Sequence, residues 1–113
     1  MNKDEQQARE DLVSAYCTLV DMGLMDQASG TVSCRVEGGM LISCSGATAN
    51  NLSPQRVVKV YDDTSYEGEI KPSSEWRMHL GIYQLNQTAN AVVHTHSDYC
   101  VALACNNLTL PGF

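Results

Sequence analysis

Two histidines separated by one residue are the feature of this sequence best suited to metal chemistry. His94 and His96 follow Ala91-Val92-Val93, an apolar, β-branched run that favours a strand. Side chains alternate between the two faces of a strand, so both imidazoles project from one side, together with Val92. Converging imidazoles suit a Zn²⁺-type ion. The alternative is a pair of ordinary histidines at a strand end, because so short a motif is weak evidence by itself.

Glu75 is the carboxylate that we expect beside the two histidines. It follows Ser73 and Ser74 and lies in the first turn of a predicted helix. The hydroxyls of these two serines and the free N–H groups at the helix start form a ready anion site. A lone acid at a helix start is also favoured by the helix dipole, whatever the function. Ser45 and Gly46 offer further phosphate donors because glycine allows close approach of the backbone. Either group can equally be ordinary turn chemistry.

The first half of the chain is predicted to form a helix and a β-hairpin. Apolar residues at spacings of three and four predict a helix from Asp4 to Met22 that ends at Gly23. The apolar stripe of this helix consists of Leu12, Tyr16, Leu19 and Val20. Strands over 31–36 and 40–44, separated by Glu37-Gly38-Gly39, are typical of a hairpin.

The second half is predicted to place Glu75 and the histidines on separate elements. A short helical turn at Ser53-Pro54 precedes a strand over 57–61. The helix after Ser73 extends to a loop at Asn86, and His79 on it is interpreted as a helix-face residue rather than a metal ligand. Beyond the histidine strand we expect a helix over 99–105, and another strand or loop at 108–113.

Composition places the chain among ordinary globular domains. Its 113 residues are 43% hydrophobic and 18% charged, which predicts one domain over 1–113. The net charge of −6 excludes nucleic-acid binding through the overall field, but a small phosphorylated ligand remains compatible, since helix starts hold anions. The five cysteines show no C-x-x-C spacing and are expected to be reduced, buried thiols.

The compartment is predicted to be the cytoplasm. The first nine residues are polar and charged, unlike a signal peptide. No apolar run reaches the roughly 20 residues that span a bilayer, so no membrane contact is expected.

Taken in order, the motifs resemble those of the class II aldolase/adducin family, especially its fuculose-phosphate aldolase branch. They read G-T-V-S, then S-G, then K-P-S-S-E-W-R-M-H, then A-V-V-H-T-H. The resemblance runs from about Ala8 to the last residue. It implies an α/β (α+β) three-layer sandwich with a mostly antiparallel central sheet flanked by helices, incomplete in this chain.

The resemblance also implies roles for individual residues. Glu75 matches the catalytic acid/base, which can also touch the metal, and His94 and His96 match two of three histidine ligands of a zinc ion or another divalent metal. The residues that match the substrate-phosphate site are Gly30, Thr31, Ser45, Gly46, Ser73 and Ser74. The implied reaction is cleavage of a ketose 1-phosphate, such as L-fuculose 1-phosphate, to dihydroxyacetone phosphate and an aldehyde. A homotetramer is implied as well.

The sequence departs from the family pattern in two respects. The first phosphate loop usually reads T-x-G-N-x-S, whereas residues 28–33 read A-S-G-T-V-S, so Thr31 replaces an asparagine and offers one hydroxyl instead of an amide. Family members also continue for about as many residues again, with the third histidine and catalytic tyrosines. Two other activities of the same superfamily are alternatives to the aldolase: a sugar-phosphate 4-epimerase and a decarboxylase of a four-carbon acid phosphate. The third alternative is an inactive, adducin-like interaction module.

Overall fold

The computed structural model describes residues 3–25 and 30–96. The helix predicted over 99–105 and the strand or loop predicted at 108–113 lie outside these residues. The described elements are α1 (Lys3–Asp21), β1 (Thr31–Val36), β2 (Gly39–Ile42), the 3₁₀ helix η1 (Pro54–Arg56), β3 (Val58–Tyr61), α2 (Trp76–Leu85) and β4 (Ala91–His94).

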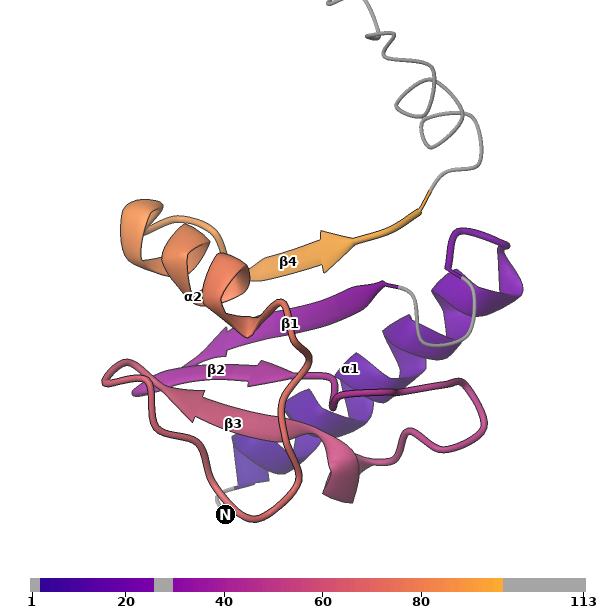
Figure 1. Cartoon of the computed structure of the whole chain (residues 1–113), viewed down its shortest axis with the longest axis horizontal. Coiled ribbons are helices and arrows are strands. Elements are labelled where there is room, and N and C mark those ends of the chain that lie inside the picture. Colours follow the sequence, from indigo (N-terminus) through magenta and orange to yellow (C-terminus); the bar gives the residue numbers. More distant parts are fainter. Residues whose placement is uncertain (1–2, 26–29, 97–113) are drawn as a thin grey trace, which may run out of the picture.

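The strands form one antiparallel sheet with a helix on each face (Figure 1). The strand order is β3-β2-β1-β4. Cys34 pairs with Leu41, and Leu41 pairs with Lys59, so these three side chains share the face on which Lys59 contacts Glu5 of α1. The next residue along β1 points to the opposite face, towards α2. This arrangement confirms an incomplete α/β sandwich whose sheet is antiparallel in the described residues.

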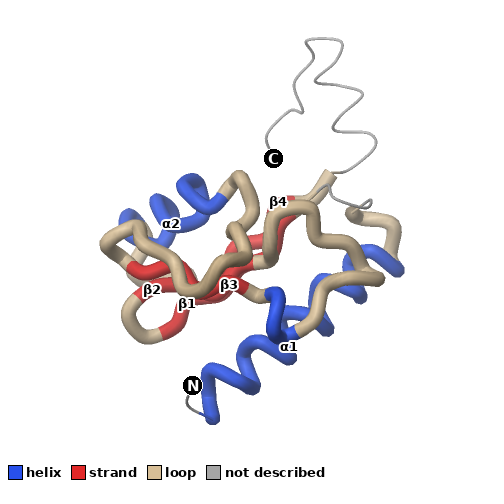
Figure 2. The backbone as a smooth tube through the Cα atoms, turned by 60° about the horizontal axis from the view of Figure 1, so that its bottom comes forward, coloured by secondary structure: helices blue, strands red, loops and turns tan. Residues whose placement is uncertain are grey.

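Helix α1 lies along one face of the sheet (Figure 2), and its predicted apolar stripe belongs to the core or packs against it. Leu12 is 4% exposed and Tyr16 is fully buried, and the Tyr16 hydroxyl donates to the carbonyl of Ala47 at 2.8 Å. The helix ends within a residue of the predicted position, and Gly23 follows it with a φ of +76°. Glycine reaches this left-handed conformation without the steric cost of a Cβ atom.

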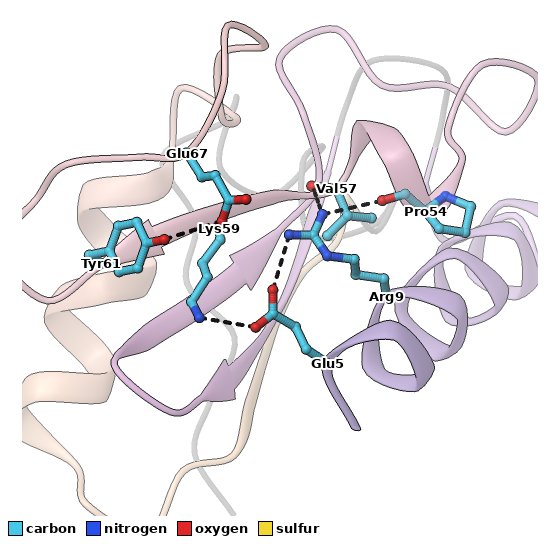
Figure 3. Close-up of polar contacts among 7 residues, drawn as sticks. All are labelled: Glu5, Arg9, Pro54, Val57, Lys59, Tyr61 and Glu67. Carbon is cyan, nitrogen blue, oxygen red and sulfur yellow. Dashed lines mark hydrogen bonds and ion pairs between the residues drawn. The ribbon is translucent and has the colours of Figure 1, made fainter. Parts of the chain in front are cut away.

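A buried arginine anchors the first turns of α1 to the segment around β3 (Figure 3). The Arg9 side chain donates to the carbonyls of Val57 and, at 3.3 Å, Pro54. It also pairs with Glu5, which accepts a 3.0 Å hydrogen bond from Lys59. These contacts fix the angle at which α1 crosses the sheet, because they join its first two turns to chain that is about fifty residues away.

The hairpin is confirmed, but its second strand begins earlier than predicted. β2 starts at Gly39, so the loop consists of Glu37 and Gly38 only, with Gly38 at a φ of +82°. A Cβ atom at position 39 would lie 2.0 Å from the carbonyl oxygen of Val60. Gly39 therefore belongs to the sheet because the neighbouring strand passes too close for any side chain.

The expectation of reduced, buried thiols is met in part, because Cys17 and Cys34 are only half-buried. Within the described residues, Cys17, Cys34 and Cys44 are free thiols, and Cys44 is buried. The other two cysteines lie outside the described residues. No helix in the part of the chain that the structure describes has the length and apolar character needed to cross a bilayer.

Candidate active site

One face of β1 is polar, and each of its side chains binds the segment that contains α2. Thr31, Ser33 and Arg35 alternate along the strand and therefore share this face; we call them the polar row. The Thr31 hydroxyl lies 2.8 Å from that of Ser73. Ser33 bonds two side chains of α2, and Arg35 donates to three backbone carbonyls at the end of that helix and beyond it. The polar row fixes α2 on the sheet by directional contacts.

The polar row also places Glu75 against His94. Thr31 pairs with His94 in the sheet register, so both side chains lie on the α2 face. Thr31 also holds Ser73, which stands two residues before Glu75. The Glu75 Oε2 atom lies 2.5 Å from Nδ1 of His94, and both side chains are about one third exposed. The predicted carboxylate and histidine therefore meet at the edge of the sheet.

Glu75 does not lie in the first turn of α2, as the sequence suggested, but at its N-cap position. The cause is a turn formed by Ser73. The Ser73 hydroxyl accepts the backbone N–H of Glu75 at 3.3 Å, and its carbonyl accepts that of Trp76 at 3.0 Å. These bonds delay the helix by a residue and direct the Glu75 side chain towards β4.

The second histidine lies next to the first. Strand β4 ends at His94, yet the ring centroids of His94 and His96 are 5.0 Å apart with an interplanar angle of 35°. The side-chain alternation expected from the sequence is therefore reproduced. With Nδ1 of His94 facing Glu75, its Nε2 atom remains available as a ligand.

These residues fit only part of a metal site. The described residues contain no cluster of three or more His, Cys, Asp or Glu side chains arranged to hold a metal ion. Two imidazoles and one carboxylate are present, but the carboxylate is engaged with an imidazole nitrogen. A zinc ion usually takes three or four protein ligands, so a complete shell requires at least one ligand from beyond this group.

A cavity of about 220 Å³ opens beside this pair. All the residues predicted to hold a substrate phosphate line this cavity. Glu75 and His96 line it as well, whereas His94 does not. Its lining consists of Gly30, Thr31, Cys44, Ser45, Gly46, Ala47, Ser73, Ser74, Glu75 and His96. The structure thus brings together residues that are up to 66 positions apart in the sequence, the difference between 96 and 30.

The donors in this cavity differ from those expected. The backbone N–H of Ser73 is not free but donates to the carbonyl of Ser43, and that of Ser45 donates to the carbonyl of Lys71, both at 2.9 Å. Their engagement follows from an antiparallel bridge that joins the two loops. The hydroxyls of Ser45 and Ser74 are exposed and have no hydrogen-bond partner among the described residues. Anion binding would therefore depend on these two hydroxyls rather than on the N–H groups of Ser73 and Ser45.

Gly30 forms one wall of the cavity at a position that excludes a side chain. Its φ is +108°, and a Cβ atom there would lie 2.5 Å from Sδ of Met25 and 3.0 Å from the carbonyl oxygen of His94. The backbone of residue 30 therefore passes directly against the strand that holds the histidine. The family resemblance predicts a phosphate contact at this glycine, and the structure adds a packing requirement.

His79 is the residue that sequence reasoning underestimated. It was interpreted as a helix-face residue, but it is completely buried, and its Nδ1 atom lies 2.6 Å from the Ser33 hydroxyl. Ser33 also lies 2.7 Å from the Tyr83 hydroxyl. Burial lowers the pKa of His79, although the negative charge of Glu75 opposes the shift. The alternation of polar and apolar residues from 31 to 36 was the signal that could have revealed a polar face opposite this helix.

Comparison with known proteins places the chain in a family. A model of the Class II Aldolase and Adducin N-terminal domain matches residues 10–112. The 5-methylthioribulose-1-phosphate/5-deoxyribulose-1-phosphate aldolase of Rhodospirillum rubrum is 36% identical over 105 residues, which are 93% of this chain and 48% of the relative. The 3-oxo-tetronate 4-phosphate decarboxylase of Cupriavidus necator is 35% identical, over 95% of this chain and 49% of the relative.

A solved structure has a similar fold. That of an L-fuculose 1-phosphate aldolase superposes with a TM-score of 0.83 at 30% identity, over 96% of this chain and 51% of its own. The chain spans about half the length of the curated relatives it matches. On the extent of the family match, this chain belongs to the Class II Aldolase and Adducin N-terminal domain family.

Proposed function

We propose that this chain provides the acid/base residue, the phosphate cavity and two metal ligands for reversible aldol cleavage of a ketose 1-phosphate. The products are dihydroxyacetone phosphate and an aldehyde, with L-fuculose 1-phosphate as the model substrate. The observation that supports this proposal most is the 2.5 Å contact between Glu75 and His94 at the mouth of a serine-lined cavity. Similarity to sugar-phosphate aldolases supports the same substrate class.

The phosphate is assigned to the cavity lined by Gly30, Thr31, Ser45, Gly46, Ser73 and Ser74. Its free hydroxyls can donate to phosphate oxygens. The Thr31 hydroxyl is bonded to Ser73, so it acts on the phosphate mainly by orienting that serine. Because this loop has Thr instead of Asn, the cavity offers one fewer side-chain amide to the anion.

His94 and His96 are the proposed ligands of a divalent ion, which we expect to be zinc. A bound ion of this kind acts as a Lewis acid towards the substrate carbonyl. Glu75 orients His94 through Nδ1, as carboxylates do behind many metal-binding histidines. Glu75 was also expected to bind the ion directly, and a turn of its side chain away from His94 would be required for that contact.

Glu75 is the proposed acid/base. In the cleavage direction the hydroxyl at carbon 4 loses a proton, the bond between carbons 3 and 4 breaks, and carbon 3 gains a proton. We assign the proton at carbon 3 to Glu75, because its carboxylate lies both in the cavity and against the candidate metal ligand. Proton transfer by a positioned carboxylate typically contributes about 10²- to 10⁴-fold to a rate.

A second candidate function shares the same residues. The similarity to a 3-oxo-tetronate 4-phosphate decarboxylase is nearly as high as the similarity to the aldolase, so a four-carbon acid phosphate is the alternative substrate. A sugar-phosphate 4-epimerase is a further alternative. An inactive interaction module is the alternative outside enzymology, and the incomplete metal shell of the described residues favours it.

The remaining assignments concern the setting of the reaction. We propose a cytoplasmic location, which agrees with the free thiols of Cys17, Cys34 and Cys44 among the described residues. A homotetramer is proposed from the family resemblance. A small phosphorylated sugar is the proposed partner, and neither nucleic acid nor a membrane is expected as one, given the net charge of −6.

Product analysis tests the proposal. The purified chain, loaded with zinc, is incubated with L-fuculose 1-phosphate, 5-methylthioribulose 1-phosphate, a pentulose 5-phosphate and a 3-oxo acid phosphate. Release of dihydroxyacetone phosphate from a ketose 1-phosphate is the expected result. Release of carbon dioxide or formation of an epimer instead would replace the aldolase assignment, and absence of all products would favour the interaction module.

A further inference from the structure

The buried residues next to the candidate acid form a hydrogen-bonded set that the proposed reaction does not use. Ser33, His79 and Tyr83 join β1 to α2 through the 2.6 Å and 2.7 Å contacts of the Ser33 hydroxyl; we call them the polar triad. Ser33 and His79 are fully buried, and Tyr83 is 2% exposed. Buried polar groups are costly unless each is paired. The protons of the triad can therefore be placed by requiring an acceptor for each donor.

The protons of the triad can be placed in order. The Tyr83 hydroxyl has Ser33 as its only side-chain hydrogen-bond partner in the part of the chain that the structure describes, so its proton is assigned to Ser33. The single Ser33 proton is then left for Nδ1 of His79. With Nδ1 accepting the Ser33 proton, the ring proton of His79 resides on Nε2.

This Nε2–H group has no partner. It is among the buried side-chain atoms of the described residues that lack a hydrogen bond. A buried donor without a partner is costly, which calls for an acceptor that is present in another state of the site. Glu75 stands four residues earlier, and positions four apart on a helix are neighbours. The Oε1 atom of Glu75 also lacks a partner among the described residues, since His94 contacts Oε2.

We propose that the polar triad fixes His79 as the Nε2–H tautomer and that this N–H group holds the Glu75 carboxylate when it turns away from His94. His79 is thus a positioning residue, and this role rests on the proposed function of Glu75 as the acid/base. The carboxylate would alternate between two imidazoles, each of which approaches it from a different element. Its orientation towards substrate would then depend on residues that the substrate never touches.

Imidazole nitrogen spectra of the full chain test the tautomer directly. Long-range proton–nitrogen NMR of the ¹⁵N-labelled protein is expected to show the proton of His79 on Nε2. Substitution Glu75→Gln should shift that signal, whereas the control Glu69→Gln, an exposed acid beside a different cavity, should not. A proton on Nδ1, a doubly protonated ring or a signal unaffected by Glu75→Gln would overturn the inference.

Two substitutions at one position test the positioning role. Glutamine extends an amide nitrogen about as far as Nε2, whereas asparagine reaches only as far as Nδ1. We expect His79→Asn to lower kcat by about 10- to 100-fold, as loss of an outer hydrogen-bond partner commonly does, with little change in KM. His79→Gln should retain most of kcat at equal folded fraction. Equal losses in both variants would overturn the role of Nε2.

The NMR spectra and the product analysis distinguish failure of this inference from failure of the proposed function. If the wild-type chain releases no product from any sugar phosphate, the proposed function fails, but the spectra still decide the tautomer and its link to Glu75. If the chain is active and the spectra place the proton on Nδ1, the inference fails and the proposed function stands.

Discussion

The two faces of the sheet are stabilised by different forces, and only one of them contains the candidate site. The α1 face is packed with apolar side chains such as Leu12 and Tyr16, and its ion pairs lie at the first turns of α1 (Figure 3). The α2 face is joined to its helix by the polar row and the polar triad. Apolar packing stabilises without regard to direction, whereas hydrogen bonds fix distances and angles. A site that needs a carboxylate at a set distance from an imidazole is therefore found on the hydrogen-bonded face.

The largest expected effect is a loss of activity, caused by a substitution on the α2 face that leaves the stability of the fold unchanged. Glu75→Gln keeps the size of the side chain but removes the carboxylate that transfers the proton, so kcat should fall by about 10²- to 10⁴-fold. Initial rates of dihydroxyacetone phosphate release measure it, with Glu69→Gln as the control. Full activity of Glu75→Gln would remove the chemical distinction between the two faces.

The largest expected effect on folding comes from the α1 face. Leu12→Ala leaves a cavity beneath α1 and should lower the free energy of unfolding by about 2–5 kcal/mol. Urea denaturation measures it, with the exposed Ser14→Ala as the matched control on the same helix. The activity per folded molecule should stay close to that of the wild type, and a loss in excess of the unfolded fraction would argue against two independent faces.

A hydroxyl deletion on the α2 face should affect both properties. Ser33→Ala leaves His79 and Tyr83 without their shared partner, which should cost about 1–3 kcal/mol of stability. Cys34→Ser, one position along β1 and on the other face, serves as the comparison. We expect Ser33→Ala to lower kcat beyond the loss of folded protein, while Cys34→Ser changes stability alone. Rates normalised to folded fraction distinguish these outcomes.

The smallest expected effect is a pH dependence that originates at the α1 face. Burial of Glu5 opposes its ionisation, but hydrogen bonds from Lys59 and Arg9 outweigh this effect and lower the pKa of the carboxyl. A lowered pKa in the folded state means that the contribution to stability is complete above the ordinary value of 4.5 and is lost as the pH falls through the folded value. Thermal unfolding below pH 4.5 should be less pH-dependent in Glu5→Gln, and identical acid profiles would contradict this assignment.

The parts of this arrangement that depend on local sequence patterns could be predicted from the sequence. The helix stripe, the hairpin glycines and the His94/His96 alternation all depend on residues close in the chain, and all were identified. The location of Glu75 at the N-cap depended on Ser73 bonding both Thr31 and the following backbone. That contact spans 42 positions and has no periodic signature, so it could not be anticipated.

The role of His79 was missed for a related reason. A histidine at a helix position gives no sign of whether it faces solvent or sheet, since α2 has apolar residues on more than one side. The polar residues of β1 were visible as an alternation, but their partners on α2 were not. Which N–H groups remained free for an anion also depended on the bridge between the loops at Cys44 and Pro72.

Calorimetric titration with zinc tests most directly the claim that the α2 face contains a metal-dependent site. We expect the wild-type chain to bind one ion and His94→Ala to lose this binding, with the heat of thermal unfolding unchanged between the two proteins. Absence of zinc binding by the wild-type chain, or equal binding by His94→Ala, would contradict it.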